Sequence, residues 1–325
     1  MTTAFESDPI LVEVVRGGYV ESVHHGRVAV TNPDGSLAAS LGADLAPMYP
    51  RSSSKPMQAV GMLRAGLDLS EELLALVAAS HSGEPFHLAG TRAILARHGL
   101  EESALQTPAD WPSDELARHQ VIAAGGQPTP VAMNCSGKHA GMLATTVVNG
   151  WPVESYREPD HPTQLAILRA IDDLSGEQAT QVAVDGCGAP LYAISLYAVA
   201  RAFGRMAAAT SGAEARVADA IRSHPEWTSG TRRDELELHR AVPGLLCKAG
   251  AEAVHAVGLP DGRGVAVKVS DGSQRARPVA MAGVLQRLGF DHDTLAEQAS
   301  APVFGHGERV GEIRPVAETL ARLEA

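Results

Sequence analysis

The sequence predicts an α+β fold in which both ends of the chain contribute strands to one antiparallel sheet. Three observations support this prediction. Strand-like runs occupy the chain up to Leu41, helical patterns dominate the middle, and strand patterns return from Ala253 onward. Because strands and helices are segregated along the chain instead of alternating, a parallel βαβ arrangement is not expected.

The N-terminal strands are recognised by composition and by the turn that interrupts them. β-branched residues are concentrated in the runs 10–15, 18–22 and 27–31, and a further run at 37–41 follows the turn Asn32-Pro33-Asp34-Gly35. Asn-Pro and Asp-Gly pairs favour chain reversal. We therefore expect an antiparallel meander in this part of the chain.

The middle of the chain carries helix signals. Apolar residues recur at helical spacing from Met57 to Leu67. Ser70 is a typical N-cap for a helix through Ala79, and Gly99 is a typical C-cap for a helix over 86–98. Further helices are expected at 163–173, 190–208 and 212–222.

Strand patterns return near the C-terminus. Runs at 253–259 and 265–270 flank a turn at 260–264, and a helix at 279–288 precedes a short strand at 309–313. These elements predict a sheet lobe of roughly residues 8–50 and 250–315. A central helical lobe of roughly residues 56–245 completes a single domain, 1–325.

Composition narrows the class of protein. The net charge of −11 repels phosphate backbones and anionic lipid, so neither a nucleic acid nor a membrane is an expected partner. No apolar run approaches the roughly 18 residues of a membrane helix. The residues up to Pro9 lack the basic n-region of a signal peptide, so we expect no signal peptide and a cytoplasmic location. HExxH, GxSxG, Walker and GxGxxG motifs are absent from the sequence.

Lysines are scarce. Of 27 basic residues only four are lysines: Lys55, Lys138, Lys248 and Lys268. Arginine stays protonated in proteins, whereas a buried lysine can serve as a base or a ligand. The lysines that remain are therefore candidates for chemistry, although drift under codon bias would explain them too.

Two serine-rich segments could carry a nucleophile and a proton relay. In Arg51-Ser52-Ser53-Ser54-Lys55-Pro56, Ser52 and Lys55 stand three apart at a helix start and share a face, so the amine can accept the proton of the hydroxyl. In Ser80-His81-Ser82-Gly83-Glu84, Ser80 can supply a second hydroxyl. The alternative for either segment is a helix cap.

The three cysteines suggest metal binding or packing. An odd, low number favours reduced thiols over a disulfide framework. Cys135 lies three residues before Lys138, and Cys187 lies in the turn Asp185-Gly186-Cys187-Gly188. Two thiolates and a third ligand would form an open zinc site; the alternative is glycine-rich turns with incidental cysteines. Cys247 precedes Lys248-Ala249-Gly250. This Lys-x-Gly tripeptide resembles the third element of serine β-lactamases and penicillin-binding proteins, which is an edge strand beside the active site. All three cysteines nevertheless lie in glycine-containing segments that look turn-like.

Several segments in order resemble the bacterial asparaginase II family, also called rhizobial-type asparaginases. The resemblance spans nearly the whole chain. It rests on Arg16-Gly17-Gly18, Glu21-Ser22-x-His24, Arg51-Ser52-x-x-Lys55-Pro56, Ala79-Ser80-His81-Ser82-Gly83-Glu84, Asn134-Cys135-Ser136-Gly137-Lys138-His139-x-Gly141-Met142-Leu143, Asp160-His161-Pro162-x-Gln164, Asp185-Gly186-Cys187, and Lys248 with Gly250.

The resemblance implies a fold like that of serine β-lactamases and penicillin-binding proteins, a homodimer, and hydrolysis of L-asparagine to L-aspartate and ammonia in a single catalytic domain. It implies two Ser-Lys pairs, Ser52 with Lys55 and Ser80 with Lys248. Its metal site, with zinc as the ion, falls on Cys135, Lys138 and Cys187.

The remaining assignments follow from the chemistry of the expected substrate. Arg51 is the candidate for its α-carboxylate, and Asp185 either holds its α-ammonium or orients a metal ligand. Cys247 is expected to be packing, and Lys268 is expected at a surface position of a strand.

Three alternatives stay open on the sequence. The first is another Ser-Lys acyl hydrolase of the same fold: a glutaminase, an esterase or a β-lactam-recognising protein. The second is a zinc-stabilised amino-acid-binding module without turnover. The third is an enzyme in which Cys247 or Cys135 is a thiol nucleophile.

Overall fold

The computed structural model describes residues 8–324. Most of the N-terminal segment on which the signal-peptide prediction rests, residues 1–7, lies outside the described residues. The chain forms two compact units. One, here called the sheet unit, comprises 1–53, 194–208 and 237–325, and the other, the helical unit, comprises 54–193 and 209–236. Whether the chain is one catalytic domain stays a prediction.

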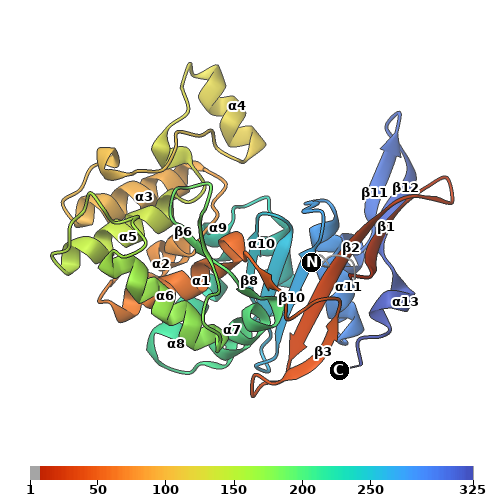
Figure 1. The fold of residues 1–325 in the computed structure, drawn as a ribbon. Coiled ribbons are helices and arrows are strands. Elements are labelled where there is room, and N and C mark those ends of the chain that lie inside the picture. The colour runs from red at the N-terminus through yellow and green to blue at the C-terminus, as the bar shows by residue number, and fades with distance from the viewer. Residues whose placement is uncertain (1–7, 325) are drawn as a thin grey trace. The chain divides into compact units, whose positions relative to one another are not determined.

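An eight-stranded antiparallel sheet dominates the sheet unit (Figure 1). Its order is β11-β12-β1-β2-β10-β9-β8, and β3 pairs with β2. The strands are β1 (Ile10–Arg16), β2 (Tyr19–Thr31), β3 (Leu37–Leu41), β8 (Leu246–Gly250), β9 (Val254–Gly258), β10 (Gly264–Val269), β11 (Ala301–Gly305) and β12 (Glu308–Pro315). The predicted α+β class, with a sheet built from both ends of the chain, is confirmed.

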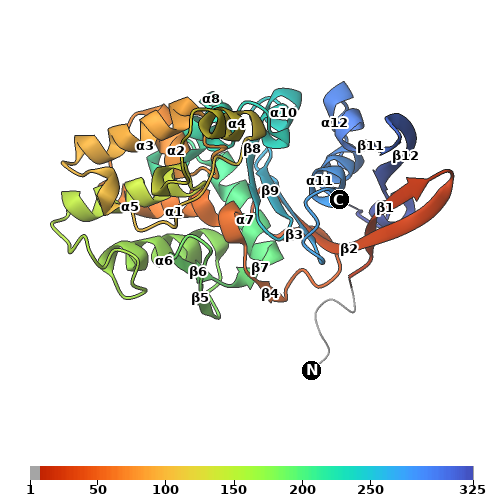
Figure 2. The ribbon, with the colours of Figure 1, turned by 90° about the horizontal axis from the view of Figure 1, so that it is seen from above.

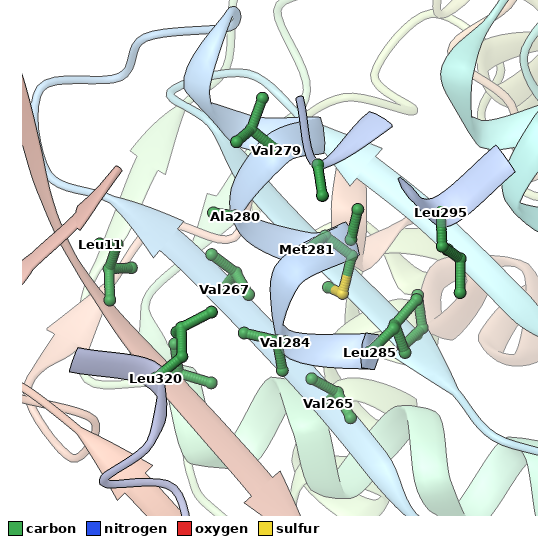
Figure 3. Close-up of a cluster of buried hydrophobic side chains, with 14 of the residues drawn as sticks. Leu11, Val265, Val267, Val279, Ala280, Met281, Val284, Leu285, Leu295 and Leu320 are labelled. Carbon is green, nitrogen blue, oxygen red and sulfur yellow. The ribbon is translucent and has the colours of Figure 1, made fainter. Parts of the chain in front are cut away.

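Helices cover both faces of this sheet. Successive residues of β10 point to opposite faces, and Val265 and Val267 pack with α11 (Ala276–Arg287) in the hydrophobic cluster drawn in Figure 3. Glycine at 264 allows close approach of α7 (Leu196–Ala208), because a Cβ there would lie 1.8 Å from the carbonyl oxygen of Ala200. The sheet unit also contains α12 (Asp293–Gln298), α13 (Ala317–Leu320) and a short ribbon of β4 (Pro47–Met48) with β7 (Ile194–Ser195).

The helical unit is organised around α1 (Lys55–Arg64), which packs against α2, α5, α6 and α8 (Figures 1 and 2). Residues 55–63 of α1 are all buried. The other elements are α2 (Glu71–Val77), α3 (Pro85–Arg97), α4 (Glu115–Ala123), α5 (Ser136–Val148), α6 (Pro162–Ser175), α8 (Gly212–Ser223), α9 (Pro225–Thr228) and the hairpin of β5 (Val182–Val184) and β6 (Pro190–Tyr192). In sequence, α10 (Asp234–Ala241) runs across the division between the units.

The structure corrects two predicted elements. The runs 18–22 and 27–31 are predicted as separate strands but form one strand, β2, from Tyr19 onward. Gly26, between the two runs, lies in close contact with β10, since a Cβ there would lie 2.5 Å from the carbonyl oxygen of Lys268. The helix predicted at 190–208 begins only at Leu196, because Ser195 Oγ accepts a hydrogen bond from the amide of Ala198 (3.0 Å) and so caps the helix there. Within residues 8–324, no helix combines the length and apolar character needed to cross a bilayer.

Candidate active site

Ser52 lies in the sheet unit on a tight turn that leads into α1. The turn is the 3-10 helix η2 (Arg51–Ser54). Arg51 adopts φ 53°, a left-handed conformation that is uncommon for a residue with a side chain. The carbonyl oxygen of Pro50 accepts hydrogen bonds from the Ser53 hydroxyl (2.7 Å) and the Ser53 amide (3.2 Å). The backbone around Ser52 is therefore tightly constrained.

Lys248 lies on β8 close to this turn. Two residues further on, a Cβ at Gly250 would lie 2.8 Å from the Pro50 oxygen, 3.0 Å from the Ser53 nitrogen and 3.2 Å from the Ser52 nitrogen. The end of β8 thus packs directly on the backbone of the Ser52 turn. Alternate residues of a strand share a face, so Lys248 projects from the face of β8 that this turn covers. Its side chain is fully buried and donates to the carbonyl oxygen of Ala249 (2.8 Å).

Cys247 occupies a regular strand, not the turn-like segment that its neighbours suggested. Its sulfur lies 3.1 Å from Nε2 of His255, whose Nδ1 lies 3.1 Å from Nη1 of Arg277. All three residues are buried, and Cys247 belongs to the hydrophobic cluster beneath α11. This environment agrees with the expected packing role.

Lys55 and Ser80 meet inside the helical unit. Lys55 is the first residue of α1 and its side chain is fully buried. Its Nζ donates to the carbonyl oxygen of Ala79 and to the Ser80 hydroxyl (3.0 Å). This distance is within the range for proton transfer between a general base and a hydroxyl.

Two hydrogen bonds tie the Ser80 loop to the segment that carries Cys135. The amide of His81 donates to the carbonyl oxygen of Asn134 (3.0 Å), and His81 Nε2 lies 2.8 Å from Ser136 Oγ. Burial, together with the charges of His87 and Lys55, lowers the pKa of His81 well below its usual value. Because Nδ1 accepts from the amide of Gly83 (3.1 Å), the neutral ring donates from Nε2 to Ser136.

Cys135, Lys138 and Cys187 form a buried cluster, also in the helical unit. Cys135 is the N-cap of α5, and Lys138 lies in its first turn. The Lys138 ammonium donates to Cys187 Sγ (3.3 Å), and the two cysteine side chains are hydrogen-bonded to each other. Cys187 lies in the turn between β5 and β6, as predicted.

Glycines near Cys135 permit helix packing and do not form a turn, contrary to the sequence-based interpretation. A Cβ at Gly137 would lie 2.5 Å from the carbonyl oxygen of Leu76, and a Cβ at Gly141 would lie 2.7 Å from a methyl carbon of Val77. Both glycines let α5 approach the end of α2 closely. The Cys-Ser-Gly-Lys-His segment is therefore the start of a buried helix.

Electrostatics in the cluster favour a thiolate on Cys187 next to a charged lysine. The hydrogen bond to Cys187 and burial raise the pKa of Cys135, whereas the same hydrogen bond, with Lys138 nearby, lowers the pKa of Cys187. Burial lowers the pKa of Lys138, but the sulfurs of Cys187 and Cys135 and the Asp185 carboxylate outweigh it and raise that pKa overall. Both shifts favour the charged forms of Cys187 and Lys138, whose sulfur and nitrogen lie 3.3 Å apart.

The cluster has a donor set that suits zinc. Two sulfurs and one nitrogen are gathered there, and such ligands leave one position of a tetrahedral zinc ion open. Binding would require both thiols and the Lys138 amine to lose their protons. Residues 8–324 contain no group of three or more His, Cys, Asp or Glu that could hold a metal, so Lys138 would have to be the third ligand.

The two residues predicted to bind substrate lie in different units. Arg51 is on the Ser52 turn, with Nη1 3.7 Å from Oε1 of Glu252. Asp185 is in the helical unit, with Oδ2 4.0 Å from Cys187 Sγ, and its Oδ1 accepts from the amide of Gly186 (2.9 Å). Asp185 thus lies beside one of the predicted metal ligands, and both of its predicted roles stay predictions.

The sequence analysis missed residues that support the cluster. Nδ1 of His139 lies 2.7 Å from the Tyr156 hydroxyl, which accepts from the amide of Gln106 (3.2 Å). Both rings are fully buried, and His139 lies beside Cys187. His139 belongs to a motif segment and could have been singled out, but Tyr156 has no local signal because only the tertiary fold brings it to α5.

Comparison with known families defines the class of protein to which these residues belong. The pattern of the L-asparaginase II family matches residues 12–315. The chain therefore belongs to the L-asparaginase II family. The predicted family is therefore confirmed. No curated protein sequence matches the chain.

Several solved structures are distantly similar. A structure described as Mglu has TM-score 0.42 and 13% identity over 77% of this chain, which spans only 62% of that protein's length. A probable glutaminase has TM-score 0.41 and 15% identity, over 77% of this chain and 79% of that one. A β-lactamase from Mycobacterium bovis has TM-score 0.44 and 15% identity, over 80% of this chain and 94% of that one. Likeness at this level does not bear on the reaction.

Proposed function

We propose that the chain is an L-asparagine amidohydrolase that releases L-aspartate and ammonia through a covalent acyl-enzyme. The observation that supports this most is the pairing of a fully buried lysine amine, Lys55, with the Ser80 hydroxyl at 3.0 Å in a chain of the L-asparaginase II family. A buried amine next to a hydroxyl is the arrangement that serine–lysine hydrolases use to move a proton.

The proposed reaction has two stages. Ser52 attacks the carbon of the side-chain amide, and the amine of Lys55 takes the hydroxyl proton. Ser80, hydrogen-bonded to Lys55, passes its proton to the departing nitrogen and regains one from Lys55, so that ammonia leaves and an ester to Ser52 remains. Water then attacks this ester, its oxygen becomes part of the L-aspartate carboxylate, and the hydroxyl of Ser52 is restored.

We assign proposed roles to two further residues of the sheet unit, Lys248 and Arg51. The buried amine of Lys248 is proposed to take part in the same proton transfers as the second lysine of the family's two Ser-Lys pairs. Arg51, which directly precedes Ser52, is proposed to bind the α-carboxylate, since a guanidinium forms bidentate hydrogen bonds with a carboxylate.

Zinc is the proposed cofactor, held by Cys135, Lys138 and Cys187. When bound, zinc would act as a Lewis acid that helps to position the substrate. Asp185, whose Oδ2 lies 4.0 Å from the Cys187 sulfur, is proposed to orient that ligand without contacting the metal itself. The homodimer and the cytoplasmic location expected from the sequence stay predictions.

A substrate panel tests the proposal. Ammonia release should be measured on purified protein with L-asparagine and L-glutamine, nitrocefin and an aryl ester should be assayed in parallel, and bound zinc should be quantified. Selective release from L-asparagine with near-stoichiometric zinc would support the proposal. Preference for another substrate would reassign the enzyme, and zinc without any turnover would indicate a binding module.

A further inference from the structure

The turn between β8 and β9 places a carboxylate beside Arg51. Glu252 and Ala253 in this turn have φ of 57° and 53°, both left-handed and uncommon for residues with side chains. Such backbone strain costs energy and occurs often at ligand sites. Glu252 lies in this strained turn, and its Oε1 is 3.7 Å from Arg51 Nη1.

Lys268 holds this turn in place. Its ammonium donates to the carbonyl oxygens of Glu252 (2.7 Å) and Val269. Lys268 was expected at the surface but is only 7% exposed, because these carbonyl groups satisfy its charge inside the unit. Gly272 leaves room for the Glu252 side chain, since a Cβ at Gly272 would lie 2.6 Å from Oε2.

The same turn is anchored to the backbone around Ser52. Gly250 packs on the Ser52 and Ser53 amides, and Glu252 follows two residues later. This packing brings together Arg51, which directly precedes Ser52, and Glu252, within one unit. Their side chains are 25% and 61% exposed, so a solute can reach both.

We infer that Glu252 binds the α-ammonium group of the substrate while Arg51 binds its α-carboxylate. This inference rests on the proposed function and adds a specificity residue to it. An α-amino acid carries both charges on one carbon, so its site needs opposite charges a few ångströms apart. At 3.7 Å the Arg51–Glu252 pair is beyond hydrogen-bond distance, and an exposed ion pair of this kind adds little to stability.

The rival explanation is that Glu252 only steers Arg51. Succinamate distinguishes these two explanations, because it keeps the amide and the carboxylate of L-asparagine but lacks the α-ammonium. In Glu252→Gln we expect kcat/KM for L-asparagine to fall by about 10- to 100-fold, the usual effect of losing a hydrogen bond to a charged group, mainly through KM. Hydrolysis of succinamate should stay within about threefold of wild type.

Two further variants serve as controls for this comparison. Arg51→Ala should weaken hydrolysis of both substrates, because both carry the carboxylate. Glu308→Gln, on the exposed end of β12, should change neither. An equal fall for both substrates in Glu252→Gln, or no fall for either, would overturn the inference.

Binding of the product, L-aspartate, tests the Glu252 site independently of the proposed reaction. Calorimetry should compare L-aspartate with succinate, which lacks the ammonium, on wild type and Glu252→Gln. If wild type hydrolyses no amide but Glu252→Gln loses about 10-fold or more in affinity for L-aspartate alone, the reaction is wrong and the Glu252 site stands. If both ligands bind equally well to both proteins, the Glu252 site is wrong.

Discussion

Substitution of Gly250 by alanine tests the contact between β8 and the Ser52 turn. The added Cβ would lie 2.8 to 3.2 Å from three backbone atoms, the Pro50 oxygen and the nitrogens of Ser53 and Ser52. Backbone atoms cannot rotate away as a side chain does, so the turn itself has to move. We expect Gly250→Ala to displace the Ser52 hydroxyl relative to the groups with which it reacts.

The magnitude follows from the size of this displacement. Forcing a methyl group into a packed site costs about 1 to 3 kcal/mol of the free energy of unfolding. A shift of about 1 Å at a reacting atom lowers the rate about 100-fold. We therefore expect kcat for ammonia release from L-asparagine to fall by roughly 10- to 100-fold, with a modest decrease in Tm.

Gly305→Ala is the matched control. Gly305 lies on β11 without a positive φ, and an added Cβ would meet only side-chain atoms, the methyl carbons of Val310 at 3.3 Å and Nη1 of Arg16 at 3.8 Å. This variant should keep wild-type kcat. If Gly250→Ala lost stability but kept kcat within about threefold, the contact would not position Ser52 and the reasoning would be refuted.

Three further predictions concern stability and metal content. Burial lowers the pKa of His87 from 6.5 to about 4, so between these values the unfolded chain binds more protons, and the free energy of unfolding should fall by about 1.4 kcal/mol for each pH unit of acidification. His87→Gln should flatten that slope in thermal denaturation from pH 7 to 4; an unchanged slope would contradict the assignment. Cys187→Ser should lose bound zinc by elemental analysis while Cys247→Ala keeps it, and equal zinc content in the two would refute the ligand set. Cys247→Ala should also keep ammonia release within about threefold but lower Tm, since His255 Nε2 loses its partner at 3.1 Å; loss of activity with a stable fold would instead favour a thiol nucleophile.

Much of the fold could be predicted because local signals and tertiary packing agree. The turn at 32–35 and the Ser70 cap lie where the sequence places them, and the strands at both ends join one sheet. Two of the failures have a common cause. Gly26 and Gly137 resemble turn residues in sequence, but each is small because another backbone passes within contact distance, and that contact exists only in the folded chain.

The candidate site was predictable in its residue types but not in its partners. Scarcity singled out four lysines, and all four are buried. The fourth, Lys268, was misplaced because its partners are carbonyl oxygens of a turn, which leave no mark in the sequence. Glu252 was missed for a similar reason, since only its backbone conformation brings its carboxylate toward Arg51.

The central claim is that Ser52 is the nucleophile. It is tested most directly by ammonia release from L-asparagine by wild type, Ser52→Ala and the matched control Ser53→Ala, with circular dichroism to verify folding. We expect Ser52→Ala to lose at least about 1,000-fold in kcat, as covalent catalysis requires, whereas Ser53→Ala keeps a measurable rate despite losing its 2.7 Å hydrogen bond to Pro50. A folded Ser52→Ala protein that releases ammonia at the wild-type rate would contradict the account.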